Sequence, residues 1–424
     1  MKATTSEQLY TQGTCGGLPE ILPNAPTLDG PALKALFRER SQARTGPDRS
    51  GVWRYRELVA PGFPEDKIVT RGEGNTGFYR HPKLMSWVGL AGGDYALKHE
   101  GENPTGSFKD RGMCVGVSQA LREGAKIMAC ASTGNTSASL SSYAALAGVA
   151  AVVFVPAGKV STGKMAQTIA YGARVLKVRG NFDQALQLVE EACDRFGMAL
   201  LNSVNPWRIE GQKGIGLEIL DDLGWDAPDW IVLPSGNLGN ISALGKALRE
   251  AKRAGLIDKL PRVACVQAAG SAPFARLFDA RKTDPEAAYV AEDTPETLAT
   301  AIRIGDPRSW GKALREVGEL GGTVISVPDE EILEAKAHVD AAGIGCEPAS
   351  AASVAGLKRL VADGTIAKDA RVVSILTGHL LKDPETTAKY HQSQLSGISS
   401  ASANPFHEVD AELGAIEKAL SDLL

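Results

Sequence analysis

The stretch Lys126–Gly148, KIMACASTGNTSASLSSYAALAG, decides the fold class. It begins with the apolar run KIMACA, continues into a loop of Ser, Thr, Gly and Asn, and ends in an alanine-rich segment typical of a helix. The apolar run shows little alternation with polar residues, as expected of a strand that is covered on both faces of a parallel sheet. The stretch therefore predicts one strand–loop–helix unit of an α/β fold.

The same order of strand, loop and helix recurs toward the C-terminus. Further strands are expected within residues 151–158, 173–180, 229–234, 261–270, 323–328 and 371–378. Repeated units of this length predict two doubly wound open sheets, with ligands bound outside the carboxyl ends of the strands. The first hundred residues lack this periodicity, and we expect an extension there that packs on the core or on a partner subunit.

Length and composition exclude several classes of protein. A chain of 424 residues with 43% hydrophobic and 23% charged residues is typical of a globular protein of two or three domains. The net charge of −4 and the lack of a Lys/Arg cluster argue against nucleic acid as a partner. Without an apolar run near the roughly 20 residues of a membrane span, or an apolar signal region, a cytoplasmic protein is expected. The six cysteines form no CxxC pair, which argues against a metal site.

The most informative stretch is His99–Gly112, HEGENPTGSFKDRG. Its Pro-Thr-Gly turn is expected to open a helix, with Lys109 in the first turn. The positive end of the helix dipole favours the neutral form of an amine placed there. A neutral amine is what Schiff-base chemistry requires. Taken alone, however, the stretch fits an ordinary surface lysine at a capped helix start better.

Three further loops follow predicted strands. Ser132–Ser139, STGNTSAS, offers hydroxyl, amide and backbone N–H groups to an anion, or serves only as a turn and N-cap. Ser235–Asn240, SGNLGN, has the glycines of a phosphate-binding turn but not the GxGxxG or GK[ST] spacing of nucleotide sites. Leu376–Asp383, LTGHLLKD, places the hydroxyl of Thr377 at a strand end or forms a plain turn. Because strand-end loops converge in a doubly wound protein, these loops and Lys109 together match the needs of a phosphorylated pyridine aldehyde and an amino acid.

These motifs resemble those of the fold-type II pyridoxal-phosphate (PLP) enzymes, and in detail those of the threonine synthase family. NPTGSFKDRG, STGNTSAS, SGNLGN and TGHLLKD stand in the family's order, and GEGNT and NSVNPWRIEGQK also fit it. The resemblance extends over Thr70–Asp383. Three features depart from the family pattern: Leu380 replaces a glycine, GEGNT lacks a following proline, and of a cysteine-bearing N-terminal element only Cys15 remains.

The resemblance implies a tryptophan synthase β-like fold with PLP in the cleft between two domains. A large PLP-binding domain with an N-terminal arm is expected to comprise residues 1–115 and 206–424. A small α/β domain is expected to comprise residues 116–205, to be mobile and to close over the substrate. A homodimer is expected by the same resemblance.

The resemblance also implies which residues bind the cofactor. Lys109 would hold PLP as a Schiff base and later move protons, Asn135 would bond its phenolic oxygen, and Thr377 would face its pyridine nitrogen. The cofactor phosphate would lie in a cup made by five consecutive residues, namely Gly236, Asn237, Leu238, Gly239 and Asn240.

For the substrate, a phosphorylated amino acid, the resemblance implies two groups of residues. The carboxylate would be bound by Ser132, Thr133 and Thr136. The phosphate would be bound by Ser203 and Arg208, whose planar guanidinium suits a bidentate grip on a dianion.

The implied reaction converts O-phospho-L-homoserine and water to L-threonine and phosphate. A PLP enzyme that acts on O-phosphoserine, such as a cysteate synthase, or on serine or threonine, such as a dehydratase, would use the same lysine and cup. A difference of one methylene between substrates is poorly read from a sequence. A third alternative is a non-catalytic protein that binds PLP or an amino acid and regulates a partner, and the presence of Lys109 argues against it.

Overall fold

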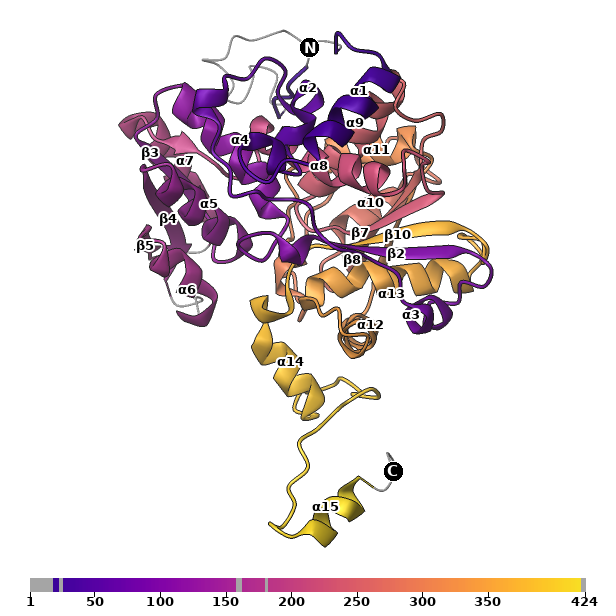
Figure 1. The fold of residues 1–424 in the computed structure, drawn as a ribbon. Coiled ribbons are helices and arrows are strands. Elements are labelled where there is room, and N and C mark those ends of the chain that lie inside the picture. The colour runs from indigo at the N-terminus through magenta and orange to yellow at the C-terminus, as the bar shows by residue number, and fades with distance from the viewer. Residues whose placement is uncertain (1–17, 23–25, 158–161, 180–181, 421–424) are drawn as a thin grey trace.

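The computed structural model describes residues 18–22, 26–157, 162–179 and 182–420, so Cys15 lies outside the described residues. Two open sheets, each flanked by helices, make up the body of the molecule (Figure 1). This arrangement confirms the predicted α/β class with doubly wound sheets.

The larger sheet has six strands in the order β1-β2-β10-β7-β8-β9. Its strands are β1 Phe78–Tyr79, β2 Asp94–His99, β7 Trp230–Pro234, β8 Arg262–Ala268, β9 Thr323–Val327 and β10 Arg371–Leu376. β1 pairs antiparallel with β2, whereas the other neighbours are parallel, as helical crossover connections require.

The smaller sheet has four parallel strands in the order β5-β4-β3-β6. Its strands are β3 Ile127–Ala131, β4 Ala150–Pro156, β5 Arg174–Val178 and β6 Ala199–Leu200.

Helices cover both faces of the two sheets (Figure 1). The helices are α1 Gly30–Arg40, α2 Arg56–Val59, α3 Pro82–Trp87, α4 Lys109–Arg122, α5 Asn135–Leu146, α6 Thr162–Ala170, α7 Phe182–Phe196, α8 Pro206–Asp222, α9 Gly239–Arg253, α10 Pro273–Ala280, α11 Trp310–Glu319, α12 Asp329–Ala341, α13 Pro348–Ala362, α14 Pro384–His391 and α15 Leu413–Ala419. α15 lies at the end of a tail that extends away from the body (Figure 1).

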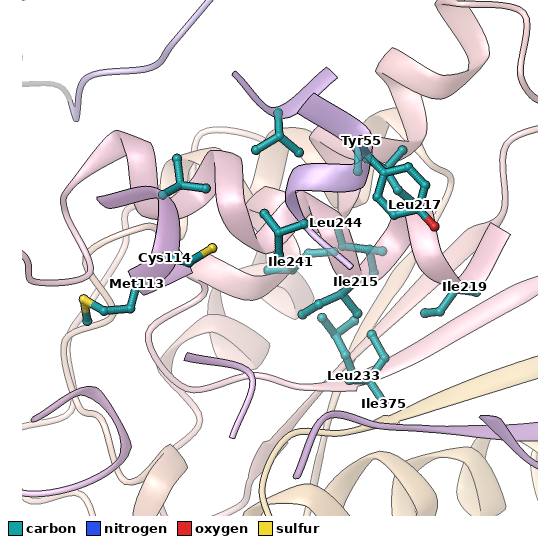
Figure 2. Close-up of a cluster of buried hydrophobic side chains, with 14 of the residues drawn as sticks. Tyr55, Met113, Cys114, Ile215, Leu217, Ile219, Leu233, Ile241, Leu244 and Ile375 are labelled. Carbon is teal, nitrogen blue, oxygen red and sulfur yellow. The ribbon is translucent and has the colours of Figure 1, made fainter. Parts of the chain in front are cut away.

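The central strand β7 of the larger sheet is apolar throughout because both of its faces are buried. Successive residues of a strand point to opposite faces, so Leu233 of β7 joins one hydrophobic cluster while its neighbour Val232 joins another. In the first cluster Leu233 lies near Ile215 of α8 and Leu244 of α9 (Figure 2). The second cluster packs against α12 and α13. The lack of alternation in the sequence therefore has the predicted cause.

All seven strands expected from the sequence are present, as β3, β4, β5, β7, β8, β9 and β10.

The expectation of an irregular extension was wrong for β2, which lies inside the larger sheet between β1 and β10. β2 does not have the pattern of a core strand because it contains Lys98, which is fully buried. The ammonium group of Lys98 is tolerated there because it lies 2.8 Å from Asp222 Oδ2 and 3.0 Å from Glu218 Oε2. Other described residues of the extension, among them Phe37 and Trp53, pack on the core as expected.

Helices α4 and α8 approach each other closely because glycines face one another at their contact. A Cβ atom added at Gly211 of α8 would lie 2.0 Å from the carbonyl oxygen of Arg111 in α4. A Cβ atom added at Gly112 of α4 would lie 2.7 Å from the carbonyl oxygen of Arg208 in α8. This contact places Lys109, the first residue of α4, close to the first turns of α8.

Substituting Gly211 by alanine is expected to lower the free energy of unfolding by about 3 kcal/mol, because backbone rather than a flexible side chain occupies the space. Gly318→Ala is the matched control, since Gly318 is an exposed helical glycine with nothing within 4 Å of the added Cβ. This control is expected to stabilise the protein by about 0.5–1 kcal/mol. Urea titration of both variants measures the difference, and equal midpoints would contradict the close contact.

Candidate functional site

Lys109 lies where α4 begins, beside the end of β10. The backbone N–H of Phe108 donates to the carbonyl oxygen of Thr377 at 3.0 Å, and the Lys109 ammonium nitrogen lies 4.1 Å from the centre of the Phe108 ring. The pKa of Lys109 is lowered to about 7, mainly by burial and also by the nearby guanidinium of Arg208, while the carboxylate of Glu347 acts in the opposite direction. Near neutral pH a large fraction of this amine is therefore unprotonated.

Thr377 presents its hydroxyl group in a buried position at the end of β10. Its Oγ1 lies 3.1 Å from the hydroxyl oxygen of Ser350, and the Ser350 hydroxyl also accepts from the N–H of Gly378 at 2.9 Å. Because Ser350 lies in the first turn of α13, that helix holds Thr377 in place. The group nearest to Thr377 Oγ1 is thus a neutral hydroxyl.

Asn135 begins α5 and reaches across to the other sheet. Its amide nitrogen lies 3.2 Å from each carboxylate oxygen of Glu347, the residue that precedes α13. Glu347 is a residue that sequence reasoning missed, because a glutamate before a proline reads only as a helix start. Burial raises its pKa.

The loop from Ser235 to Asn240 turns sharply between β7 and α9. Leu238 has left-handed backbone angles, φ 63° and ψ 7°, and an added Cβ at Gly236 would lie 3.1 Å from the Cα of Ile302. Both polar atoms of the Asn240 amide are buried without a hydrogen-bond partner among the described residues. A buried amide in that state, at a helix N-terminus, suits a polar ligand such as a phosphate.

Ser203 and Asn237 meet directly although they lie on loops from different sheets. The Asn237 amide nitrogen donates to the Ser203 hydroxyl at 2.8 Å, and its amide oxygen accepts from the N–H of Arg308 at 2.8 Å. The position of Ser203 is set by Asn202, whose side chain accepts from Ala131 N–H at 2.9 Å and so ties the ends of β3 and β6 together. Sequence reasoning did not single out Asn202 or Arg308.

Arg208 is a buried guanidinium that has no carboxylate partner among the described residues. It is 1% exposed, one of its nitrogens donates to the carbonyl oxygen of Leu201 at 2.9 Å, and its Nε has no partner among the described residues. Burial lowers its pKa to about 10. Since unpaired buried charges are costly, this guanidinium is suited to an anionic ligand.

Ser132, Thr133 and Thr136 lie on the loop and first turn that also carry Asn135. The Ser132 hydroxyl accepts from the N–H of Gly134 at 3.3 Å. Within the described part of the chain, no hydrogen bond joins these three residues to Lys109 or to the loop 236–240.

A buried network of ion pairs and hydrogen bonds fixes the residues next to Lys109 in α4. Arg111 donates to Glu100 Oε2 at 2.6 Å and also contacts Glu218. Asp110 accepts from Thr105 N–H at 2.7 Å and from the hydroxyl of Ser139 at 2.5 Å, and burial raises its pKa to about 6. The two residues that follow Lys109 in the chain, Asp110 and Arg111, therefore have structural roles.

Known proteins show which family this arrangement belongs to. Residues 69–378 match the family described as pyridoxal-phosphate dependent enzyme. The chain is 48% identical over 381 residues to threonine synthase of Methanosarcina acetivorans, covering 90% of this chain and 89% of the relative. It is 43% identical over 418 residues to threonine synthase of Methanocaldococcus jannaschii, covering 98% and 96%. The chain belongs to the threonine synthase family of pyridoxal-phosphate-dependent enzymes.

Solved structures of known proteins share the fold of this chain. Threonine synthase from Escherichia coli matches with a TM-score of 0.66 and 18% identity, over 98% of this chain and 96% of that one. Maize serine racemase matches with a TM-score of 0.64 and 19% identity, over 82% of this chain and 100% of that one. The fold is therefore shared more widely than the activity.

The residues of this chain fit the cofactor of the family. A half-buried lysine with a pKa of about 7 suits an aldehyde partner, and the unpartnered amide of Asn240 suits a phosphate. The neutral hydroxyl of Thr377 suits an unprotonated pyridine nitrogen. As a member of this family, the chain is a PLP-dependent enzyme.

The part of the chain that the structure describes contains neither a cluster of metal-binding side chains nor a membrane-spanning helix. No group of three or more His, Cys, Asp or Glu side chains there is arranged to hold a metal ion. No helix among these residues is long and apolar enough to span a bilayer. Five cysteines are buried free thiols, which behave as small hydrophobic residues in a protein core.

Proposed function

We propose that this enzyme is a threonine synthase that converts O-phospho-L-homoserine and water to L-threonine and phosphate. Family membership supports this reaction at 43–48% identity over most of the chain. The observation that carries the substrate assignment is the buried guanidinium of Arg208, which pairs with no carboxylate in the part of the chain that the structure describes and lies close enough to Lys109 to lower its pKa. An amino acid that carries a phosphate group can satisfy both features at once.

The cofactor is held, in this proposal, by Lys109 through a Schiff base, by Asn135 at the phenolic oxygen and by Thr377 at the pyridine nitrogen. Its phosphate lies in the cup of Gly236, Asn237, Leu238, Gly239 and Asn240. Bound there, PLP supplies an electron sink for negative charge at the substrate Cα.

The substrate is oriented by two groups of side chains. Ser132, Thr133 and Thr136 bind its carboxylate at the start of α5. Ser203 and Arg208 bind its phosphate, which leaves from Cγ while the guanidinium stabilises the developing charge. Lys109 Nζ accepts the proton from Cα. It then removes a proton from Cβ, before water adds at Cβ.

The pKa of Lys109 predicts how cofactor loading depends on pH. Only the neutral amine attacks the PLP aldehyde, so the rate of PLP capture by the cofactor-free protein is expected to rise through pH 7 and to level off by about pH 8. The rate of PLP capture is measured from the increase in absorbance of the lysine–cofactor adduct. A rate that continues to rise toward pH 10.5, the ordinary lysine pKa, would contradict the lowered pKa.

Residues 116–205 are proposed to form a small mobile domain that closes on the large domain, 1–115 plus 206–424. Lys382, in the short helix Leu380–Lys382 after β10, donates to the side chain of Gln167 in α6 across the two parts. Closure of this kind excludes water from the leaving phosphate.

Removing this cross-domain contact is expected to raise the KM for the phosphorylated substrate. Gln167→Ala loses a hydrogen bond to a charged partner, and an increase of about 10-fold is expected with Lys109 chemistry intact. Gln187→Ala is the matched control, because Gln187 is exposed and pairs with Glu191 on its own helix. An unchanged KM in Gln167→Ala would argue against the contact as part of closure.

The activity is tested by incubating the PLP-loaded protein separately with O-phospho-L-homoserine and O-phospho-L-serine. Equal amounts of threonine and phosphate from the first substrate support the proposal. Phosphate from phosphoserine alone would instead indicate a β-replacement or elimination enzyme with the same cofactor site. The homodimer and the cytoplasmic location belong to the same proposal, and light scattering and cell fractionation test them.

A further inference from the structure

Glu347 is a buried carboxylate at the site that no sequence motif indicated. Its side chain belongs to a residue that is 5% exposed, and its backbone N–H donates to the carbonyl oxygen of Gly378 at 3.0 Å. Both of its carboxylate oxygens lie 3.2 Å from the amide nitrogen of Asn135. An added Cβ at Gly378 would lie 2.3 Å from Glu347 Oε1, so the carboxylate fills the space beside the end of β10.

The charges around Glu347 come from three elements of the site. Lys109 at the start of α4 and Lys382 after β10 are the cations that favour its ionised form. Asp383 is the anion that opposes them. An ionised carboxylate in this position has Asn135 as its hydrogen-bond donor among the described residues.

A carboxylate fixes the orientation of a neighbouring amide, because it accepts hydrogen bonds and cannot donate them when ionised. The nitrogen of the Asn135 amide must therefore face Glu347, and its carbonyl oxygen must point away. Equal distances to the two oxygens mean that one N–H is shared between them. The second N–H of the same nitrogen is left available for another acceptor.

We propose that Glu347 is a positioning residue, which turns the Asn135 amide so that its second N–H faces the phenolic oxygen of the bound cofactor. The inference rests on the proposed function only in pairing Asn135 with that oxygen. Glu347 precedes α13 on the larger sheet and Asn135 begins α5 on the smaller one. Binding of the cofactor by Asn135 therefore also depends on the relative position of the two sheets, because the Asn135–Glu347 hydrogen bond joins them.

The test compares Glu347→Gln with Asn135→Ala and with the double variant, using PLP itself as the probe. In Glu347→Gln the amide of the new side chain has its own donors, so the orientation of Asn135 is no longer fixed. We expect PLP affinity about 10-fold weaker than in the unmodified protein, with a shifted absorbance maximum of the bound cofactor. Because the two residues act through one hydrogen bond, the double variant is expected to be no worse than Asn135→Ala alone.

A second variant tests the role of Glu347 without changing Glu347 itself. Gly378→Ala displaces the Glu347 carboxylate without changing it and is expected to shift the absorbance maximum in the same direction. Glu123→Gln is the matched control, because Glu123 accepts from the amide of Gln119 at 2.7 Å away from the site. Glu123→Gln is expected to keep the spectrum and the PLP affinity of the unmodified protein.

Two results would overturn the inference. One is a Glu347→Gln protein, folded by its thermal unfolding curve, with unchanged spectrum and PLP affinity. The other is a double variant in which the losses of the single variants add. Neither result depends on turnover, so failure of the unmodified protein to form threonine would count against the proposed reaction and not against the role of Glu347.

Discussion

Lys109→Ala is expected to lower threonine formation by at least about 1,000-fold, because one side chain serves both as covalent holder of the cofactor and as proton carrier. The lowered pKa of about 7 is what allows the amine to do both near neutral pH. Threonine release from O-phospho-L-homoserine, measured with excess PLP, gives the loss. The variant is also expected to lose the absorbance of the lysine–cofactor adduct.

The matched control for Lys109→Ala is Lys126→Ala, since Lys126 is an exposed lysine that precedes β3. Turnover and absorbance in this control are expected to equal those of the unmodified protein. A Lys109→Ala protein that retained a tenth of its activity without added amines would contradict the assignment of Lys109.

Arg208→Met is expected to lower kcat/KM for the phosphorylated substrate by about 100- to 1,000-fold, the cost of removing a charged donor from a buried anion site. The free energy of unfolding is expected to change by less than about 1 kcal/mol. The variant loses the hydrogen bond to Leu201, but it also removes a buried guanidinium that has no carboxylate partner. Kinetics and urea unfolding of the same preparation measure both effects.

Arg111→Met provides the contrasting case, because Arg111 is equally buried but is paired with carboxylates. Its loss leaves Glu100 and Glu218 without this partner in the core and is expected to lower the free energy of unfolding by about 3–5 kcal/mol. If Arg208→Met were as destabilising as Arg111→Met, the Arg208 guanidinium would have a structural role and not a binding role.

Chemistry carried by contiguous residues could be predicted from the sequence. The proposed phosphate cup lies within residues 236–240 and Lys109 lies beside its own turn, so strand, loop and helix patterns indicated both places, while their roles came from the resemblance. Arg208 was indicated only by resemblance, because burial without a partner depends on the contact between α4 and α8. The strand β2 escaped prediction because Lys98 interrupts its pattern, and its ion partners come from a helix more than a hundred residues away.

The sequence by itself therefore determined the α/β class, the seven main strands and the cofactor family, and it indicated the loops that are proposed to carry the chemistry. These follow from local periodicity and from motifs whose residues are neighbours in the chain. Only the tertiary structure decided that Glu347 faces Asn135, that Ser203 meets Asn237, and that Arg208 is buried without a carboxylate partner among the residues that the structure describes. Each of these facts depends on which side chains from distant segments share a buried space, and burial is what sets their charge, their partners and their pKa.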